Sequence, residues 1–178
     1  KVKYPAEFMT SILNAESFDL DRVAILISEA KKMGLEILPP DINESLEDFT
    51  LINPPPFVDN RDNSRESAVH KGWGTKIRFG LTAIKNLSGN AINSIIEKRK
   101  EGGYFKNIQN FLEIIPASDL NKKSLEALIK CGALDSFNER RMLLINIEEL
   151  LRYIKDLNKN NNTSQIGLFE SFKALAPL

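Results

Sequence analysis

A repeated helical pattern in the second half of the chain constrains the fold more than any other feature of the sequence. Residues Ala91–Ile96 and Ser124–Ile129 place apolar side chains at matching positions, at an offset of 33 residues. Gly102 and Gly103 follow the first run and Gly132 follows the second, and glycine commonly ends a helix. A period of this length predicts two related helical units.

The first part of the chain predicts two further helices. Pro5 stands at a first helical turn, and the apolar spacing after it predicts a helix that ends near residues 14–17. Asp19 or Asp21 can cap a second helix, and Gly34 can close it.

Extended segments follow these helices. Residues 37–43 contain two consecutive prolines, each of which disfavours helix at the residue before it, so we expect an extended stretch. Phe49–Ile52 and Lys76–Phe79 are rich in Thr, Ile and Phe and predict two antiparallel strands. The polar, proline-containing segment 53–75 between them predicts a long surface loop. The expected fold class is therefore mainly α with a small β-hairpin.

Beyond the repeats, the pattern predicts an amphipathic helix from about Arg140 to Leu157 and then a polar linker. An isolated peptide, Gln165–Phe169, follows the linker. Its apolar residues either dock in a pocket of another protein or fold back onto the core of the chain itself. The candidate partner-binding residues are Gln165, Ile166, Leu168 and Phe169.

Composition excludes several classes of protein. The chain has no apolar run of about 18 residues and no signal sequence, so we expect neither a membrane span nor export, and a cytoplasmic location. Cys131 and His70 are the only residues of their types, which excludes disulfides within the chain and the usual Cys/His zinc site. Because the sequence opens on Lys1, we expect a longer parent protein.

The formal net charge of zero hides an asymmetry. Residues 1–75 hold 8 Lys/Arg and 13 Asp/Glu, whereas residues 76–160 hold 15 Lys/Arg and 10 Asp/Glu. A polyanion would therefore be attracted to the second region, although solvated helices often carry as many lysines.

The segment Ala83–Ala91 has the form of helix, tight turn with an apolar centre, and helix, which is the helix-hairpin-helix arrangement. Backbone N–H groups in such a turn and at the start of the second helix point at a DNA phosphate, and the helix dipole favours the negative charge. The usual turn is glycine, apolar residue, glycine, so this sequence departs from it; a plain helical hairpin is the alternative. The candidate residues are Lys85, Asn86, Leu87, Ser88 and Gly89.

The second unit has Ile115–Asn121 as its turn, and Lys122 and Lys123 begin the helix that follows. Lysine in a first helical turn opposes the helix dipole, which is unfavourable unless an anion lies close by. The pattern indicates either a phosphate site or two solvated lysines.

Asp19-Leu20-Asp21 is the only Asp-x-Asp sequence, and polymerases hold two Mg²⁺ ions with paired aspartates on adjacent strands. This pair lies at a predicted helix start instead, where an aspartate caps the helix. We therefore assign no catalytic residue and no metal ligand.

Taken together, these segments resemble the bacterial DNA polymerase III alpha subunit over about nine tenths of the chain. The likeness is collinear, and only the long 53–75 loop and the first turn depart from it. The segments that carry the resemblance are Tyr4–Met9, Lys31–Gly34, Ile37–Asn43, Phe49, Ile77–Lys85, Gly102–Lys106, Asn121–Ser136 and Gln165–Phe169.

The resemblance implies a helical fingers segment followed by tandem helix-hairpin-helix units that grip duplex DNA. It also implies that Gln165–Phe169 binds the sliding clamp (beta subunit), that other polymerase III holoenzyme subunits are partners, and that the catalytic aspartates with their Mg²⁺ lie in a palm outside this chain. The implied regions are the end of the fingers at 1–75, the tandem DNA-binding region at 76–138, an amphipathic helix at 139–160, and the linker with the clamp peptide at 161–178.

Two other classes of function fit part of the sequence. One is a non-catalytic helix-hairpin-helix DNA-binding module of a repair or recombination protein, from which the fingers-like segment before residue 50 would distinguish the polymerase. The other is a protein-interaction domain with no DNA role, which salt-dependent duplex binding would exclude.

Overall fold

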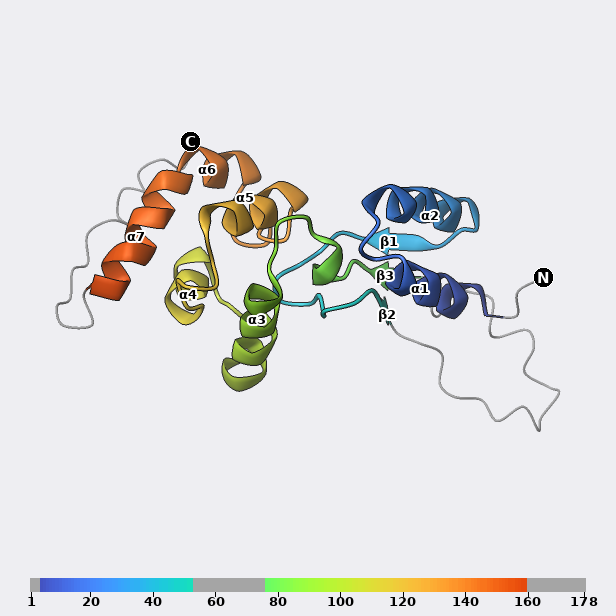
Figure 1. The fold of residues 1–178 in the computed structure, drawn as a ribbon, viewed down its shortest axis with the longest axis horizontal. Coiled ribbons are helices and arrows are strands. Elements are labelled where there is room, and N and C mark those ends of the chain that lie inside the picture. Colours follow the sequence, from blue (N-terminus) through green and yellow to red (C-terminus); the bar gives the residue numbers. More distant parts are fainter. Residues whose placement is uncertain (1–3, 53–75, 160–178) are drawn as a thin grey trace.

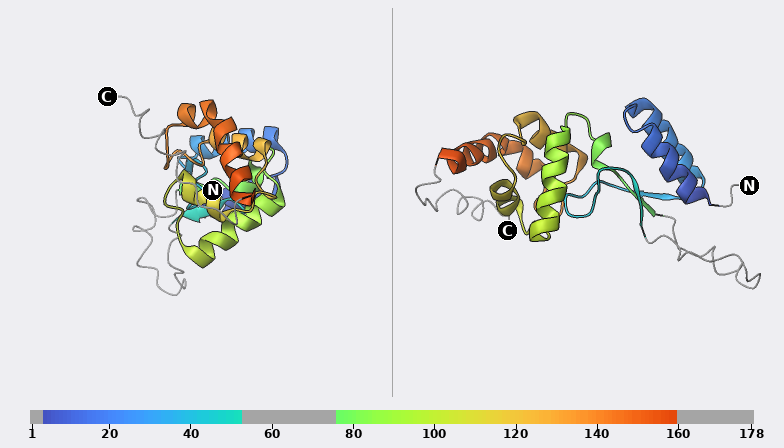
Figure 2. Two further views of the ribbon diagram at one scale, coloured as in Figure 1. Left: turned by 90° about the vertical axis from the view of Figure 1, so that its left-hand side faces the viewer. Right: turned by 60° about the horizontal axis from the view of Figure 1, so that its bottom comes forward.

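The computed structural model describes residues 4–52 and 76–159 of the 178-residue chain. The predicted loop 53–75 and the predicted peptide 165–169 lie outside the described residues. The described part is mainly helical, with a three-stranded sheet (Figure 1). Two helices lie with the sheet at one end of the molecule and a larger group of helices lies at the other, as the right-hand view of Figure 2 also shows.

The two helices beside the sheet follow the local signals in the sequence. α1 spans Pro5–Ala15 and has its proline in the first turn, where the missing N–H would have no partner in the helix. α2 spans Leu20–Lys32, and the Asp19 carboxylate caps it by accepting hydrogen bonds from two backbone N–H groups at 3.1 Å each. Gly34 follows with a φ of +81°, a conformation that glycine adopts without strain. Asp19, rather than Asp21, is therefore the cap.

The sheet contains the predicted hairpin and one strand that was not predicted. β2 (Thr50–Ile52) pairs antiparallel with β3 (Lys76–Arg78), as expected. β1 (Glu36–Leu38) pairs with β3 in parallel, so that the strand order is β1-β3-β2. A strand of three residues carries too short a pattern to be assigned from sequence, and its pairing depends on a partner about 40 residues away.

The prediction that residues 37–43 are extended is correct only at the start of this segment, where β1 lies. Residues 42–44 form a turn instead. The Asp41 carboxylate accepts a hydrogen bond from the Asn43 N–H at 2.7 Å, and the Asp41 carbonyl accepts one from the Ser45 N–H at 2.8 Å. Aspartate favours such turns because its side chain reaches the backbone two residues on.

A first apolar cluster joins α1 and α2 to the sheet. Leu13 and Ile77 are fully buried in it, and Phe49 is 1% exposed. Its buried members are Ala6, Met9, Leu13, Val23, Leu26, Ala30, Leu35, Phe49, Ile77 and Ala83.

The larger group of helices begins with the repeated units. α3 spans Gly89–Gly102, α4 spans Ile108–Ile114 and α5 spans Lys122–Cys131. Gly103 follows α3 with a φ of +80°, and Gly132 ends α5 in the left-handed conformation, so the predicted glycine ends are confirmed.

The helix expected before α3 is only a 3-10 turn, η1 (Leu81–Ala83). The N–H groups of Leu81 and Thr82 donate to the carbonyls of Leu46 and Glu47, each at 2.9 Å. These long-range bonds set the direction of the chain at this point, and the extended backbone at Ile84 then ends the turn. Local periodicity does not reveal such a constraint.

The predicted helix from about Arg140 to Leu157 is two helices, α6 (Arg140–Ile145) and α7 (Ile147–Lys159). The interruption is at Asn146, whose side-chain amide donates a hydrogen bond to the Met142 carbonyl at 2.9 Å. Asparagine interrupts helices because its side chain competes for backbone groups in this way.

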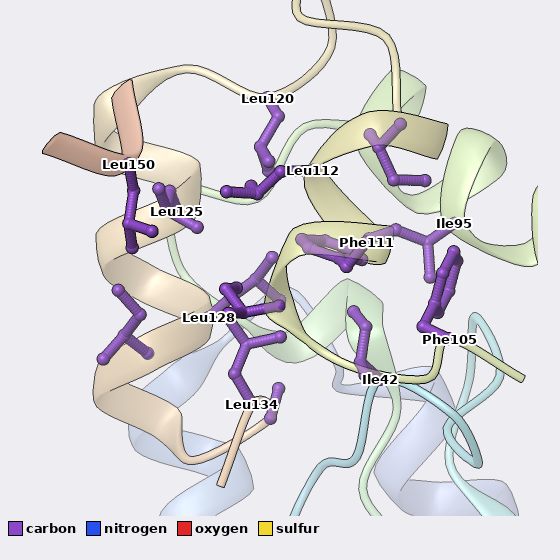
Figure 3. Packing of buried hydrophobic residues seen from close by; sticks show 14 of the residues in the cluster. Ile42, Ile95, Phe105, Phe111, Leu112, Leu120, Leu125, Leu128, Leu134 and Leu150 are labelled. Atoms are coloured by element: carbon purple, nitrogen blue, oxygen red, sulfur yellow. The ribbon is translucent and has the colours of Figure 1, made fainter. Parts of the chain in front are cut away.

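A second apolar cluster fills the space between α3, α4, α5, α6 and α7. Figure 3 shows Leu112, Leu120 and Leu125 meeting on one side of this cluster. On the other side, the rings of Phe105 and Phe111 lie perpendicular to each other with their centroids 5.2 Å apart.

Two asparagines fasten distant segments with paired hydrogen bonds. The Asn14 amide on α1 accepts from the Phe49 N–H at 2.8 Å and donates to the Phe49 carbonyl at 3.1 Å. The Asn43 amide bonds both backbone groups of Phe105 in the same way, at 2.8 and 3.0 Å. Each asparagine therefore satisfies two backbone groups of a buried phenylalanine.

The two apolar clusters exchange chain segments across the predicted boundary between residues 75 and 76. Ile42, from the first part of the sequence, is fully buried in the second cluster and donates its N–H to the Ala133 carbonyl at 2.9 Å. Ile77 and Ala83, from the second part, belong to the first cluster. Phe79 packs against both clusters.

Gly80 allows β3 to pass close to the chain that precedes β2. A Cβ atom at this position would lie 2.4 Å from the Asp48 carbonyl carbon and 2.6 Å from the Phe49 nitrogen. Both neighbours are backbone atoms, which a side-chain rotation cannot move away.

Replacing Gly80 with alanine should therefore lower the free energy of unfolding by about 1–3 kcal/mol, because the backbone must shift to admit the methyl group. Gly102→Ala is the matched control, since a Cβ there meets no atom within 4 Å. Denaturant unfolding of the two variants tests the expectation. Equal stability of both would contradict the close approach at Gly80.

Candidate nucleic-acid interface

The first turn, residues 84–88, has the geometry that the sequence predicts despite its missing glycines. Asn86 has a φ of +68° and is exposed, so it adopts the left-handed conformation that glycine usually provides. Leu87, at the centre of the turn, packs against the second apolar cluster. Lys85 is exposed beside them.

Ser88 completes this turn by capping α3. Its hydroxyl oxygen accepts a hydrogen bond from the Ala91 N–H at 3.2 Å, and its carbonyl accepts one from the Ile92 N–H at 3.0 Å. Within the described residues, no group accepts a hydrogen bond from the N–H of Gly89 or Asn90. The start of α3 thus presents two donors in succession at the positive end of the helix dipole.

The second turn, residues 115–121, repeats this arrangement. Leu120 is 2% exposed, and the Asn121 side chain caps α5 by accepting from the Ser124 N–H at 2.9 Å. Leu120 and Asn121 follow Leu87 and Ser88 at the same offset of 33 residues. Among the residues that the structure describes, the N–H groups of Lys122 and Lys123 likewise have no acceptor.

Reciprocal hydrogen bonds hold the two turns together. The Ser124 hydroxyl on α5 donates to the Asn86 carbonyl of the first turn at 3.1 Å. The Ser94 hydroxyl on α3 donates to the Asp119 carboxylate of the second turn at 2.5 Å. Asn86 and Asp119 are themselves 33 residues apart, so each unit uses its second helix to hold the turn of the other. The starts of α3 and α5 therefore lie close together.

The structure brings all seven predicted residues, Lys85 to Gly89 with Lys122 and Lys123, to these two neighbouring turns. Their side chains are not equivalent. Ser88 serves as a cap and Leu87 packs inward, whereas Lys85 and Lys123 are exposed and form no ion pair with any other described residue.

Lys122 has a partner that the sequence reasoning missed. It forms an ion pair with Glu148 on α7. The hydrogen bond between them raises the pKa of Lys122 above its ordinary value and lowers the pKa of Glu148, so both groups are charged at neutral pH. Glu148 is 26 residues away on another helix, and no local pattern connects the two. The Glu148 carboxylate offsets the unfavourable interaction between the Lys122 charge and the positive end of the α5 dipole.

The candidates that were set aside have structural roles. Asp19 caps α2, and Cys131 is half-buried against the second cluster, where burial raises the pKa of its thiol. In the part of the chain that the structure describes, no three Cys, His, Asp or Glu side chains lie close enough to share a metal ion. Over residues 4–52 and 76–159, no helix has the length and apolar character to cross a bilayer.

The predicted clamp-binding residues, Gln165, Ile166, Leu168 and Phe169, lie outside the described residues. Their assignment stays a prediction from the sequence.

Comparison with known families agrees with this geometry. The protein-family model described as "Helix-hairpin-helix motif" matches the sequence of residues 34–144, which include both turns and α3 to α5. The chain belongs to the helix-hairpin-helix motif family. This chain places asparagine and serine in the first of its two turns.

Curated proteins that share this helix-hairpin-helix region confirm the resemblance stated from the sequence. Over 95% of this chain, the sequence is 37% identical to DNA polymerase III subunit alpha of Thermus aquaticus. Over 97% of this chain, it is 36% identical to the subunit of Deinococcus radiodurans. The subunit of Campylobacter jejuni is 34% identical over 94% of the chain. The chain spans only 11–13% of the length of these relatives.

The left-handed backbone at Asn86 yields a stability prediction for this helix-hairpin-helix turn. Asn86→Gly should retain or slightly raise the free energy of unfolding, because glycine adopts this φ without strain. Asn86→Val should lower it by about 1–2 kcal/mol, because a β-branched residue is strained there. Chemical unfolding measures both, and a valine variant as stable as the glycine variant would contradict the observed turn.

Proposed function

We propose that this chain is a part of a bacterial replicative DNA polymerase, the DNA polymerase III alpha subunit, and that it holds duplex DNA by the phosphate backbone. One observation carries the proposal. The starts of α3 and α5, each with two N–H groups that bond no other described residue, are held together by reciprocal serine hydrogen bonds. Sequence identity of 34–37% to polymerase III alpha subunits, over about 95% of the chain, supports the assignment.

Phosphate contact explains what the two turns can do chemically. Backbone N–H groups at a helix start bind an anion without a catalytic side chain, and the helix dipole favours the negative charge. Lys85 and Lys123 add attraction from the exposed sides of the turns. Contacts of this kind position a duplex but read no bases, so binding is independent of sequence and falls with salt.

We assign no catalytic residue to this chain, so the chemistry of polymerisation would belong to other parts of the parent protein. We place the polymerising aspartates and their Mg²⁺ ions in a palm elsewhere in the parent, and the end of the fingers region at residues 1–75. The chain then contributes the grip on the duplex behind the templating site, in the cytoplasm, together with other polymerase III holoenzyme subunits.

The alternative, a non-catalytic DNA-binding module of a repair or recombination protein, would share the two turns. The likeness to polymerase alpha subunits favours the polymerase because it extends beyond the turns. It covers 94–97% of the chain, whereas the helix-hairpin-helix model begins at residue 34. The segment with α1 and α2 is therefore part of the likeness.

The contribution of a single backbone N–H can be tested at Gly89. Gly89→Pro removes the N–H, which bonds no other described group, and proline suits the first position of a helix. The preceding residue, Ser88, has a ψ of 153°, which is compatible with a following proline. Duplex affinity should fall about tenfold at low salt, since one hydrogen bond to a charged phosphate is lost.

Gly89→Ala is the matched control, because it adds a Cβ but keeps the N–H, and among the described residues a Cβ there meets no atom beyond its own helix within 4 Å. Fluorescence anisotropy with labelled duplexes of unrelated sequence measures both variants. Equal affinity of the alanine and proline variants would show that this N–H does not contact phosphate, and a change of preference between duplexes would indicate base reading instead.

We also propose that Gln165–Phe169 tethers the parent polymerase to its sliding clamp. Leu168 and Phe169 would enter an apolar pocket of the clamp, each contributing about 1.5–3 kcal/mol if fully buried, and Gln165 would add hydrogen bonds. This proposal rests on the sequence of the peptide and on its position after a polar linker.

Changing both Leu168 and Phe169 to alanine should remove most of the affinity for the clamp while leaving melting temperature and duplex binding nearly unchanged. Phe172→Ala with Leu175→Ala is a matched control, because it removes the same side-chain types just beyond the peptide. Titration with purified clamp and thermal melting give both quantities. Unchanged clamp binding, or a large loss of stability, would mean that the two residues belong to the core of the chain.

A further inference from the structure

A groove lies between α7 and the second turn, beside the start of α5. Asn121 and Lys122 line it on one side, and Glu148, Arg152 and Lys155 line it from α7. It therefore reaches the start of α5 at Lys122, whose N–H donates to no other described group. The sequence predicted α7 only as part of an amphipathic helix from about Arg140 to Leu157, and no function was assigned to that helix.

Packing of α7 against the second apolar cluster and α4 fixes the direction in which α7 presents these residues. Leu150 and Ile154 are buried in the second apolar cluster. The Tyr153 hydroxyl donates to the Glu113 carboxylate on α4 at 2.5 Å and accepts from the Gln109 amide at 3.2 Å. Burial, with the bond to Glu113, raises the pKa of Tyr153 to about 12, so the hydroxyl keeps its proton and this link at neutral pH.

The polar face of α7 is consequently held toward the groove. Glu148, Arg152 and Lys155 follow one another at intervals of four and three residues, which places them along one face of the helix. Arg152 and Lys155 are exposed, and neither forms an ion pair with another described residue. Two cations are therefore available beside the start of α5.

One carboxylate stands among these cations. Glu148 pairs with Lys122, and this bond is the largest cause that lowers the pKa of Glu148; the charges of Arg152 and Lys155 lower it further. Glu148 is thus ionised at neutral pH, and the groove carries three positive charges against one negative charge. An anionic group already occupies the lysine that a DNA phosphate would contact.

We propose that this groove is an additional phosphate-binding subsite for duplex DNA, in which Arg152 and Lys155 contact the backbone and Glu148 competes with the phosphate for Lys122. The proposal rests on the proposed function, because it extends the same DNA-binding surface from the two turns onto α7. It assigns a DNA-binding role to α7, and to Glu148 the role of an internal competitor that limits affinity.

The competition has a definite direction. When a phosphate approaches the start of α5, Lys122 exchanges the Glu148 carboxylate for a phosphate oxygen, and the released carboxylate repels the incoming charge. Removing the charge of Glu148 therefore frees Lys122 and removes the repulsion. Removing Arg152 and Lys155 takes away two contacts that neutralise phosphates.

Duplex titration of the full 178-residue chain at several salt concentrations tests both parts of the proposal. Arg152→Gln with Lys155→Gln should weaken binding about tenfold at low salt and flatten the salt dependence by about two phosphate contacts. Lys31→Gln with Lys32→Gln, at the end of α2, is the control with the same change of net charge. The variant with Arg152→Lys and Lys155→Arg keeps both positive charges and should bind duplex DNA about as tightly as the unchanged chain.

Glu148→Gln should strengthen duplex binding about two- to fivefold at low salt, because the lost competitor is an exposed ion pair. Glu29→Gln on α2 makes the same change of charge far from the groove and should have a smaller effect. Melting curves should show that all these variants remain folded, since the changed side chains are exposed.

Lys122→Glu with Lys123→Glu separates the two levels of the proposal. If this double variant weakens binding while Arg152→Gln with Lys155→Gln does not, α7 does not contact DNA and the subsite is wrong, although the two turns still bind. If neither pair affects binding, the proposed grip on duplex DNA fails as well. Weaker binding by Glu148→Gln would show that Glu148 positions Lys122 rather than competing for it, which would overturn the second part.

Discussion

The inward packing of one apolar side chain in each turn orients the surface that we propose for DNA binding. Leu87 and Leu120 stand at equivalent places in the two units, and both pack against the second cluster. With these side chains directed inward, the backbone that follows each leucine lies at the surface, where its N–H groups remain open to solvent. Burial thus supplies the orientation that a phosphate-binding turn requires, at two sites that share one core.

Much of this arrangement could be predicted from local sequence signals. Glycine ends, the Asp19 cap and the offset of 33 residues each reflect chemistry within a few neighbouring residues, and the structure confirms them. The two paired turns could also be located because Asn86 is a residue type that tolerates a positive φ. For the same reason, the absence of glycine did not remove the turn.

The features that sequence reasoning missed depend on distant partners. β1 needs β3 beside it, η1 is limited by hydrogen bonds to residues 46 and 47, and Lys122 meets Glu148 only after α7 has packed. The division of α6 from α7 is different, because Asn146 is a local signal that the strong apolar periodicity on both sides concealed. A local pattern does not reveal these features, either because their cause is remote in the sequence or because a stronger local periodicity conceals a weaker signal.

The paired amide bonds of Asn14 and Asn43 have a mechanical consequence. Two hydrogen bonds to one residue resist rotation as well as separation, so each asparagine fixes the relative orientation of the two segments that it joins. The segment from Asn43 to Phe49 is fastened in this way at both ends, once to each half of the molecule. We therefore expect a displacement of the helices at one end of the described molecule to be passed on to α1 and the sheet at the other end.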